Sequence, residues 1–239
     1  MIEKLLLRLR ARHELSLDEE RALLETLIGP EEIPAGRTVV RRYERINRSI
    51  LLIDGLMCRY KDLRDGRRQI TALHIPGDFL DLHGYTLKYL DHDLMALCPS
   101  RIAYAPHERI DRITEQFPHL TRLFWFSTNL DAAMHREWEL SLGQRLGAAR
   151  AAHLLCELHV RFTIVGMAQG NAFDLPMNQS EFGECLGLTV VHTNRVLKEL
   201  RQRGLAEFAK GHVKIHDLAG LRAFAEFDPA YLYLPGPDH

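Results

Sequence analysis

The sequence lacks any apolar run that approaches the ~20 residues needed for a membrane-spanning helix. It also lacks the uninterrupted apolar core of a signal peptide, because charged residues break up the leucines of the N-terminal stretch MIEKLLLRLRARHELSLDEE. We therefore expect a cytoplasmic protein that makes no membrane contacts and begins with an amphipathic helix.

Cysteine is scarce, and its spacing excludes the common metal sites. None of the four thiols belongs to a C-x-x-C pair, and their spacings match no zinc or iron–sulfur pattern. No metal site is predicted. The cysteines expected to be reduced and packed as small apolar side chains are Cys58, Cys98, Cys156 and Cys185.

An excess of charge is also absent, since 31 Lys and Arg oppose 32 Asp and Glu, for a formal net charge of −1. The molecule as a whole is therefore no polycation, and any binding to nucleic acid must come from a local basic patch. Hydrophobic residues make up 46% of the 239 residues, which is enough for one or two domains with a buried core.

The pattern of apolar and polar residues changes along the chain. Ser16 and Glu19 form a capping box that predicts a helix over residues 17–28. From Ile33 to Tyr104 the residues alternate and are interrupted by turn signals such as PAG, DG and PGD. This pattern predicts antiparallel strands joined by tight turns, and many short strands of this kind favour a barrel or roll.

Helical periodicity replaces the strands after Pro106, and a long helix is expected to begin at Pro118. Its apolar residues recur at alternating three- and four-residue steps, which is typical of a coiled-coil seam. The residues predicted to form a dimer contact are Leu123, Phe126, Leu130, Ala133 and Leu140. Such a helix can also pack on its own domain, and both interpretations leave Phe124 and Trp125 free to face the roll.

Two short helices separated by GLT form a helix-turn-helix pattern. The first opens at Asn178 and ends near Gly187, and Thr189 caps the second. Small residues, Gly183 and Gly187, fall where the two helices are expected to cross. The core contacts of this unit are assigned to Leu188, Val196, Leu197 and Leu200.

A predicted β-hairpin follows this pattern, over LAEFAKGHVKIHDL with a tight turn at Lys210 and Gly211. A hairpin in this place is a wing. The fold class is therefore predicted as α+β, with an N-terminal antiparallel, jelly-roll-like β-roll, a long dimerisation helix and a C-terminal winged helix-turn-helix. The expected domains are residues 1–117, 118–144 and 145–239.

The outward face of the second helix is expected to bind DNA, because an α-helix fits the major groove and its N-terminal residues reach base edges. Arg195 can pair with guanine O6 and N7, whereas Lys198 and Arg201 are better placed for phosphates. A dimer would present two such helices to a palindromic operator. The predicted DNA-binding residues are Gln179, Ser180, Thr189, Val190, Val191, His192, Asn194, Arg195, Lys198, Arg201, Lys210 and His212.

Other function classes fit the sequence less well. A lone helix-turn-helix match also fits an ordinary helical hairpin or an interaction module that does not bind DNA, but the basic wing and Arg195 favour DNA. The sequence contains no G-x-S-x-G, no P-loop and no His-x-His pair followed by glutamate. We therefore do not expect an enzyme.

With these motifs in place, the sequence resembles the Crp/Fnr family of bacterial transcription regulators along nearly its whole length. SEFGECLGLTVVHTNRVLKELRQRGL is similar to the family's helix-turn-helix signature, and LLIDGLMCRYKDLRDGRRQITALHIPGDFLDL to the centre of its β-roll. The resemblance implies a homodimer that binds an effector in or beside the roll and thereby changes the geometry of two DNA-reading helices. It also implies RNA polymerase as a partner if the protein activates transcription.

The sequence departs from the family pattern at three points. Members that bind cyclic nucleotides carry a Gly-Glu pair and a later Arg-Ser or Arg-Thr pair, which PGDFLDLHGYTLKYLDHDLMALCPSRIAY lacks, so cyclic AMP is not expected. Members with an iron–sulfur cluster hold it through N-terminal cysteines, but the first cysteine here is Cys58, so no such cluster is expected. Val191 stands where the family often has a glutamate that accepts from cytosine.

The identity of the effector stays open. Histidines are frequent in the effector region, which allows a haem or small-molecule sensor, since some relatives sense gases through haem. The alternative is that these histidines are simply hydrogen-bonded or lie on the surface. The residues predicted to line an effector pocket are His74, Asp81, His83, His92 and His135.

Overall fold

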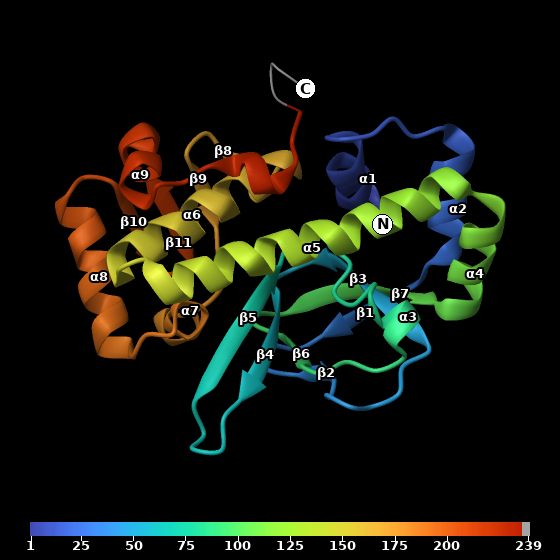
Figure 1. The fold of residues 1–239 in the computed structure, drawn as a ribbon, viewed down its shortest axis with the longest axis horizontal. Helices are drawn as coiled ribbons and strands as arrows, with labels where there is room; N and C mark the ends of the chain where they lie inside the picture. Colours follow the sequence, from blue (N-terminus) through green and yellow to red (C-terminus); the bar gives the residue numbers. More distant parts are fainter. Residues whose placement is uncertain (236–239) are drawn as a thin grey trace.

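The computed structural model describes residues 1–235 and contains an antiparallel roll, a long helix and a winged helix-turn-helix, as predicted (Figure 1). Two helices precede the roll, α1 (Glu3–Arg10) and α2 (Leu17–Thr26). The strands of the roll are β1 (Ile28–Ile33), β2 (Thr38–Val40), β3 (Arg48–Asp54), β4 (Met57–Asp62), β5 (Arg68–His74), β6 (Asp93–Ala96) and β7 (Ser100–Pro106), with the short helix α3 (Gly84–Leu87) before β6.

The roll consists of two antiparallel sheets, with strand orders β1-β7-β3 and β2-β6-β4-β5. Their inner faces share one apolar core, to which β3, β4 and β7 contribute Ile50, Met57 and Ile102. The Asp65–Gly66 turn joins β4 and β5 in a hairpin, as predicted. The Asp54–Gly55 turn instead carries the chain from one sheet to the other, because β3 pairs with β7.

The capping box predicted for α2 is present. The Ser16 side chain accepts a hydrogen bond from the Glu19 N–H at 3.3 Å, and the Glu19 carboxylate accepts one from the Ser16 N–H at 2.9 Å. The helix ends at Thr26 rather than at residue 28. The strands begin earlier than predicted, because Ile28 already pairs with Tyr104 of β7.

Helix α4 (His107–Gln116) leads into α5 (Pro118–Gln144), which runs along the whole molecule (Figure 1). Most of the predicted dimer seam on α5 is covered within the chain itself. Leu123 is only 2% exposed, and Leu130 and Ala133 are also buried within their own chain. Phe126 packs edge-on against His13 and Tyr233, at 4.8 and 6.1 Å between ring centroids.

The N-terminal and C-terminal segments of the same chain therefore cover the face of α5 that periodicity marked as a seam. Of the five predicted contact residues, Leu140 alone is exposed. Phe124 does face the roll, with its ring 6.0 Å from that of Phe79, but Trp125 points away and is 66% exposed. Trp125 belongs to an exposed stripe at three- and four-residue steps that comprises Arg122, Trp125, Asn129, Ala132, Arg136 and Glu139.

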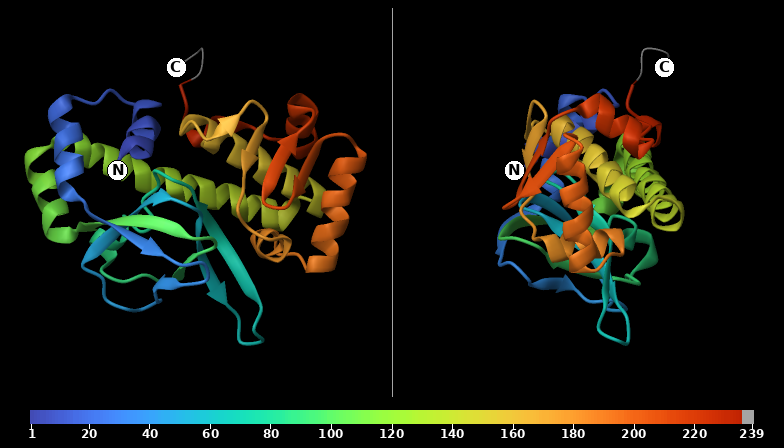
Figure 2. Two further views of the ribbon diagram at one scale, coloured as in Figure 1. Left: turned by 180° about the vertical axis from the view of Figure 1, so that it is seen from behind. Right: turned by 90° about the vertical axis from the view of Figure 1, so that its left-hand side faces the viewer.

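The rest of the chain forms a compact unit at the C-terminal end of α5 (Figures 1 and 2). Helix α6 (Gly147–Ile164) runs through its centre and is buried on most sides. The four-stranded sheet has the order β10-β11-β9-β8. The remaining elements are β8 (Ala168–Gln169), β9 (Ala172–Asp174), α7 (Gln179–Leu186), α8 (Val190–Gln202), β10 (Ala206–Ala209), β11 (His212–Ile215), α9 (Leu218–Ala225) and the 3-10 helix η1 (Pro229–Leu232).

Within residues 1–235, no helix has both the length and the apolar composition needed to cross a membrane.

Candidate nucleic-acid interface

Local hydrogen bonds define both ends of the helix-turn-helix. The Asn178 side chain accepts from the N–H groups of Ser180 and Glu181, at 2.9 and 3.0 Å, and the Glu181 carboxylate accepts from the Asn178 N–H at 2.7 Å. Gly187 ends α7 in the left-handed region, with φ of 63°. The Thr189 hydroxyl accepts from the His192 N–H at 3.3 Å and so caps α8, as predicted.

The two helices cross where glycine was expected. A Cβ on Gly183 would lie 2.4 Å from the Thr193 hydroxyl oxygen and 3.0 Å from the Leu188 carbonyl oxygen. Thr193 is fully buried and donates a hydrogen bond to the Thr189 carbonyl at 3.0 Å. Close approach of α7 and α8 therefore requires a residue without a side chain at position 183.

Helix α8 divides cleanly into a buried and an exposed face. Thr193, Val196, Leu197 and Leu200 are buried, whereas Leu188, also assigned to the core, is half-buried. The exposed residues on the opposite face are Val190, Val191, Asn194, Arg195, Lys198, Arg201 and Gln202. This separation leaves polar and cationic groups on a solvent-exposed face that does not pack against the rest of the fold.

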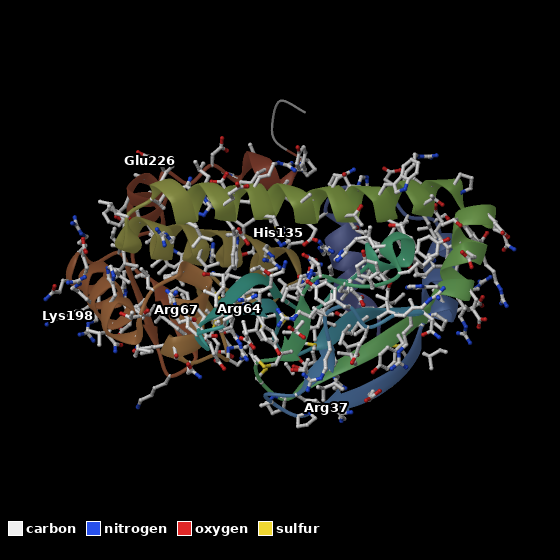
Figure 3. The ribbon with its side chains drawn as sticks, turned by 60° about the horizontal axis from the view of Figure 1, so that its bottom comes forward. Arg37, Arg64, Arg67, His135, Lys198 and Glu226 are labelled. Carbon is white, nitrogen blue, oxygen red and sulfur yellow. The ribbon has the colours of Figure 1, made fainter. Side chains whose placement is uncertain are left out.

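The cationic groups at this surface differ in whether they already form ion pairs with carboxylates. In the described part of the chain, no carboxylate oxygen lies within 4.0 Å of the charged nitrogens of Arg195, Lys198 or Lys210. Lys198 projects outward at the edge of the molecule (Figure 3). Arg201 lies 3.7 Å from the Glu207 carboxylate, an exposed and therefore weak ion pair.

The wing has the predicted form, with β10 and β11 paired around a turn in which Lys210 and Gly211 both have positive φ. Lys210 is exposed, but the His212 imidazole is hydrogen-bonded to the Asp174 carboxylate of β9 at 2.8 Å. At the start of α7, Ser180 is exposed and Gln179 is half-buried. His192 is half-buried beside Gly147 at the start of α6, so its ring is directed toward its own domain.

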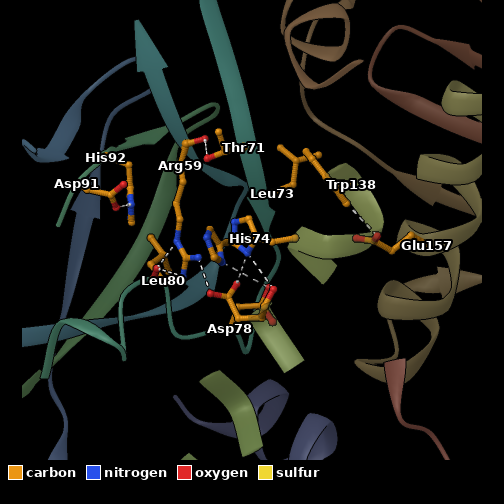
Figure 4. Close-up of polar contacts among 12 residues, drawn as sticks. Arg59, Thr71, Leu73, His74, Asp78, Leu80, Asp91, His92, Trp138 and Glu157 are labelled. Carbon is orange, nitrogen blue, oxygen red and sulfur yellow. Dashed lines mark hydrogen bonds and ion pairs between the residues drawn. The ribbon is translucent and has the colours of Figure 1, made fainter. Parts of the chain in front are cut away.

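The residues predicted to line an effector pocket surround a side chain that the sequence analysis did not select. Arg59 of β4 is buried and donates from Nε to the Leu80 carbonyl at 2.8 Å and from Nη1 to the Asp131 carboxylate of α5 at 2.5 Å (Figure 4). This guanidinium thus ties the roll to α5. Its only sequence signal was one arginine within the otherwise apolar start of the strand MCRYKD.

The five predicted residues have distinct environments near Arg59. Rings of His83 and His92 lie 5.5 Å apart, and burial, reinforced by the Arg59 charge, lowers the pKa of each to about 4. The buried His74 has a pKa well below its usual value for the same reasons. His135 is hydrogen-bonded to the Asp131 carbonyl at 2.9 Å.

Asp81 lies deeper in the roll. Its carboxylate accepts a hydrogen bond from the Ile50 N–H at 2.6 Å, and burial raises its pKa to about 7. Within residues 1–235, no group of three or more His, Cys, Asp or Glu side chains could hold a metal ion. A haem ligand among these histidines stays a prediction.

A buried ionic network joins the winged unit to the roll, and the sequence analysis missed it. Arg161 of α6 donates to the Asp78 carboxylate at 2.7 Å and to the Glu157 carboxylate at 3.0 Å. Asp78 also pairs with Arg8 of α1 at 3.1 Å. Trp138 donates to Glu157 at 3.0 Å, which adds α5 to the network (Figure 4). Asp78 belongs to the PGD turn, so this turn contacts α1 and α6 directly and is linked to α5 through Glu157.

The cysteines are packed as expected. All four are free, and Cys58, Cys156 and Cys185 are buried. Burial raises the pKa of each of these three thiols, which favours the unreactive protonated form.

Comparison with known proteins agrees with this arrangement. Residues 30–117 match the cyclic nucleotide-binding domain family, and residues 149–224 match the Crp-like helix-turn-helix domain family. The transcriptional activator protein FnrL of Cereibacter sphaeroides is 30% identical over 213 residues, which cover 85% of this chain and 83% of the relative. FnrA of Stutzerimonas stutzeri, also a transcriptional activator protein, is 27% identical over 211 residues, covering 88% and 86%.

Among solved structures, FixK2 from Bradyrhizobium japonicum is similar in fold, with a TM-score of 0.74 at 22% sequence identity. The match covers 82% of this chain and 98% of FixK2.

Proposed function

Since the chain belongs to the Crp/Fnr family of transcription regulators, we propose that it works as a homodimer that reads a palindromic operator through one α8 helix in each half-site. The observation that carries this proposal is the exposed face of α8, where Arg195 and Lys198 have no acidic partner among residues 1–235 while the opposite face is buried. Free cations on a helix of this kind are suited to the major groove.

The proposed contacts follow from the exposure of each residue. Arg195 recognises a guanine through two hydrogen bonds, and Val190 and Val191 offer apolar contacts to thymine methyl groups. Lys198, Lys210 and Ser180 position the protein on phosphates. His192 and His212 are engaged within their own domain, so we assign them smaller roles than the sequence suggested.

The dimer contact is proposed to use the exposed stripe of α5 in place of the buried seam. Trp125 and Ala132 supply apolar surface, and Arg136 and Glu139 are opposite charges on the same stripe. The 27 residues of α5 form a rod of about 40 Å, which is long enough to define the relative position of two winged units. The division into residues 1–117, 118–144 and 145–239 is supported by the two family matches on either side of α5.

Two further partners are proposed, RNA polymerase and an effector. Transcriptional activation, the activity of the curated relatives, requires a surface that contacts RNA polymerase. The proposed effector is not cyclic AMP. A cyclic phosphate needs an arginine partner, and the buried guanidinium beside the predicted pocket, that of Arg59, already donates to the Leu80 carbonyl and the Asp131 carboxylate.

Selection of binding sites from random duplex DNA, with and without cell extract, tests the proposal. We expect a palindromic consensus with a guanine that depends on Arg195. The Arg195→Ala variant should lose about 1–3 kcal/mol of binding free energy and should accept other bases at that position. A consensus without symmetry would contradict the dimer. Full sequence-specific binding by Arg195→Ala would instead favour an interaction module.

A further inference from the structure

The C-terminal end of α7 receives hydrogen bonds from two distant parts of the chain. The last carbonyl groups of a helix have no partner within the helix and need donors from elsewhere. Here the Gln69 amide of β5 donates to the carbonyl oxygens of Glu184 and Cys185, at 2.7 and 3.3 Å. The next carbonyl, that of Leu186, accepts from Nη1 of Arg150 in α6.

Arg150 also caps the end of α5. Its Nε donates to the Ser141 carbonyl, and its Nη2 donates to the carbonyls of Leu142 and Arg145, all at 3.0 Å. One planar guanidinium thus bridges the C-terminal ends of α5 and α7, where both helix dipoles place partial negative charge. In the described chain, no carboxylate oxygen lies within 4.0 Å of its nitrogens, so backbone carbonyls alone satisfy it.

These contacts converge on the turn that precedes α8. A Cβ on Gly187 would lie 3.4 Å from the Gln69 amide oxygen and 3.4 Å from the Leu142 side chain. One side of the turn is therefore in contact with the roll, with the end of α5 and with α6. A change in the angle between α5 and α7 would break the Arg150 contacts at one end or the other.

We propose that Arg150, assisted by Gln69, is a positioning residue that sets the direction of α8 relative to α5 and so selects the distance between operator half-sites. This inference rests on the proposed homodimer. Arg150 does not act on DNA directly, because four donated hydrogen bonds already occupy its guanidinium. Its effect reaches the DNA through the placement of α7 and α8.

The test compares full-length variants on the selected operator and on duplexes whose half-sites are moved one or two base pairs closer or farther apart. Arg150→Met keeps an unbranched side chain that is compatible with a helix but removes all donors. We expect its affinity for the preferred spacing to fall about tenfold or more, with affinities for the other spacings nearly unchanged. Arg150→Lys should restore part of the preference, since an ammonium cannot reach all four carbonyls.

Two controls separate positioning from phosphate contact and from loss of fold. Lys198→Ala should lower the slope of log Kd against log salt by about 1 and keep the spacing preference, whereas Arg150→Met should keep the slope. If Arg150→Met does not fold, Gln69→Leu provides the same test from the roll side. It should also reduce the difference in affinity between the preferred half-site spacing and the others.

The outcomes are distinct. An Arg150→Met protein that folds and keeps the parental spacing preference, or that loses salt dependence as Lys198→Ala does, overturns the inference. A parental protein that shows no sequence-specific binding, or binds single half-sites only, contradicts the proposed function instead.

Discussion

The crossing of α7 and α8 at Gly183 allows a quantitative prediction about the helix-turn-helix. Replacement by alanine adds a methyl group 2.4 Å from the Thr193 hydroxyl oxygen and 3.0 Å from the Leu188 carbonyl oxygen. Thr193 cannot easily rotate, because it is fully buried and donates to the Thr189 carbonyl. Overpacking of this kind costs about 1–3 kcal/mol, against a gain of about 1 kcal/mol in helix propensity.

The 2.4 Å contact with a fully buried side chain places this substitution in the upper part of the overpacking range, at about 2–3 kcal/mol. After the gain in helix propensity, we expect Gly183→Ala to lower the free energy of unfolding by about 1–2 kcal/mol, measured by urea denaturation at fixed protein concentration. Specific DNA affinity should fall as well, because α8 must move to relieve the contact. Gly143→Ala is the matched control, since this helical glycine of α5 has nothing within 4 Å of the added carbon, and it should be neutral or stabilising.

A double-mutant cycle identifies the cause. Thr193→Ala alone removes a buried hydrogen bond and should cost about 1 kcal/mol. Combined with Gly183→Ala it removes the closest clash, so the double variant should be more stable than the sum of the two single effects by at least about 0.5 kcal/mol. A Gly183→Ala protein as stable as the parent, or strict additivity in the cycle, would refute the steric argument.

Three other predictions concern the ionic network, the roll and the dimer. Asp78→Asn should lower the free energy of unfolding by about 3–5 kcal/mol in chemical denaturation, because Arg8 loses its buried partner and Arg161 loses one of its two, whereas the exposed Asp65→Asn should have no measurable effect. Burial raises the pKa of Asp81 from 3.8 to about 7, so its contribution to stability is lost as pH rises through this range. Asp81→Asn should accordingly gain stability relative to the parent from pH 4 to 7, and a constant difference across that range would contradict the assignment. Trp125→Glu should shift sedimentation toward the monomer and weaken operator binding, and a variant that stays fully dimeric would exclude the exposed stripe as the interface.

Local sequence was sufficient for the elements of the winged helix. The capping residues Asn178 and Thr189 act on N–H groups within three positions, and the turn at Lys210 and Gly211 joins strands that are adjacent in the chain. Gly183 could also be assigned to the crossing, since only two consecutive helices were involved. For the same reason the predicted face of α8 agrees with the exposure of Arg195 and Lys198.

The face of α5 could not be assigned in this way. Periodicity shows that Leu123, Leu130 and Ala133 share an apolar side of the helix, but it does not show what covers that side. Packing of the chain's own ends against α5 buried these residues and left Trp125 outside. A buried seam and an exposed seam have the same sequence pattern, because both need only one apolar stripe.

The sequence by itself determined the order of roll, long helix and winged helix, the caps and the exposed face of α8, because each depends on residues close together in the chain. Tertiary structure alone decided which side chains join these parts. Asp78 meets Arg161 across 83 positions, and Gln69 meets the end of α7 across 115. Charges and amides so far apart carry no local pattern, and only the packing of the domains brings their donors and acceptors within bonding distance.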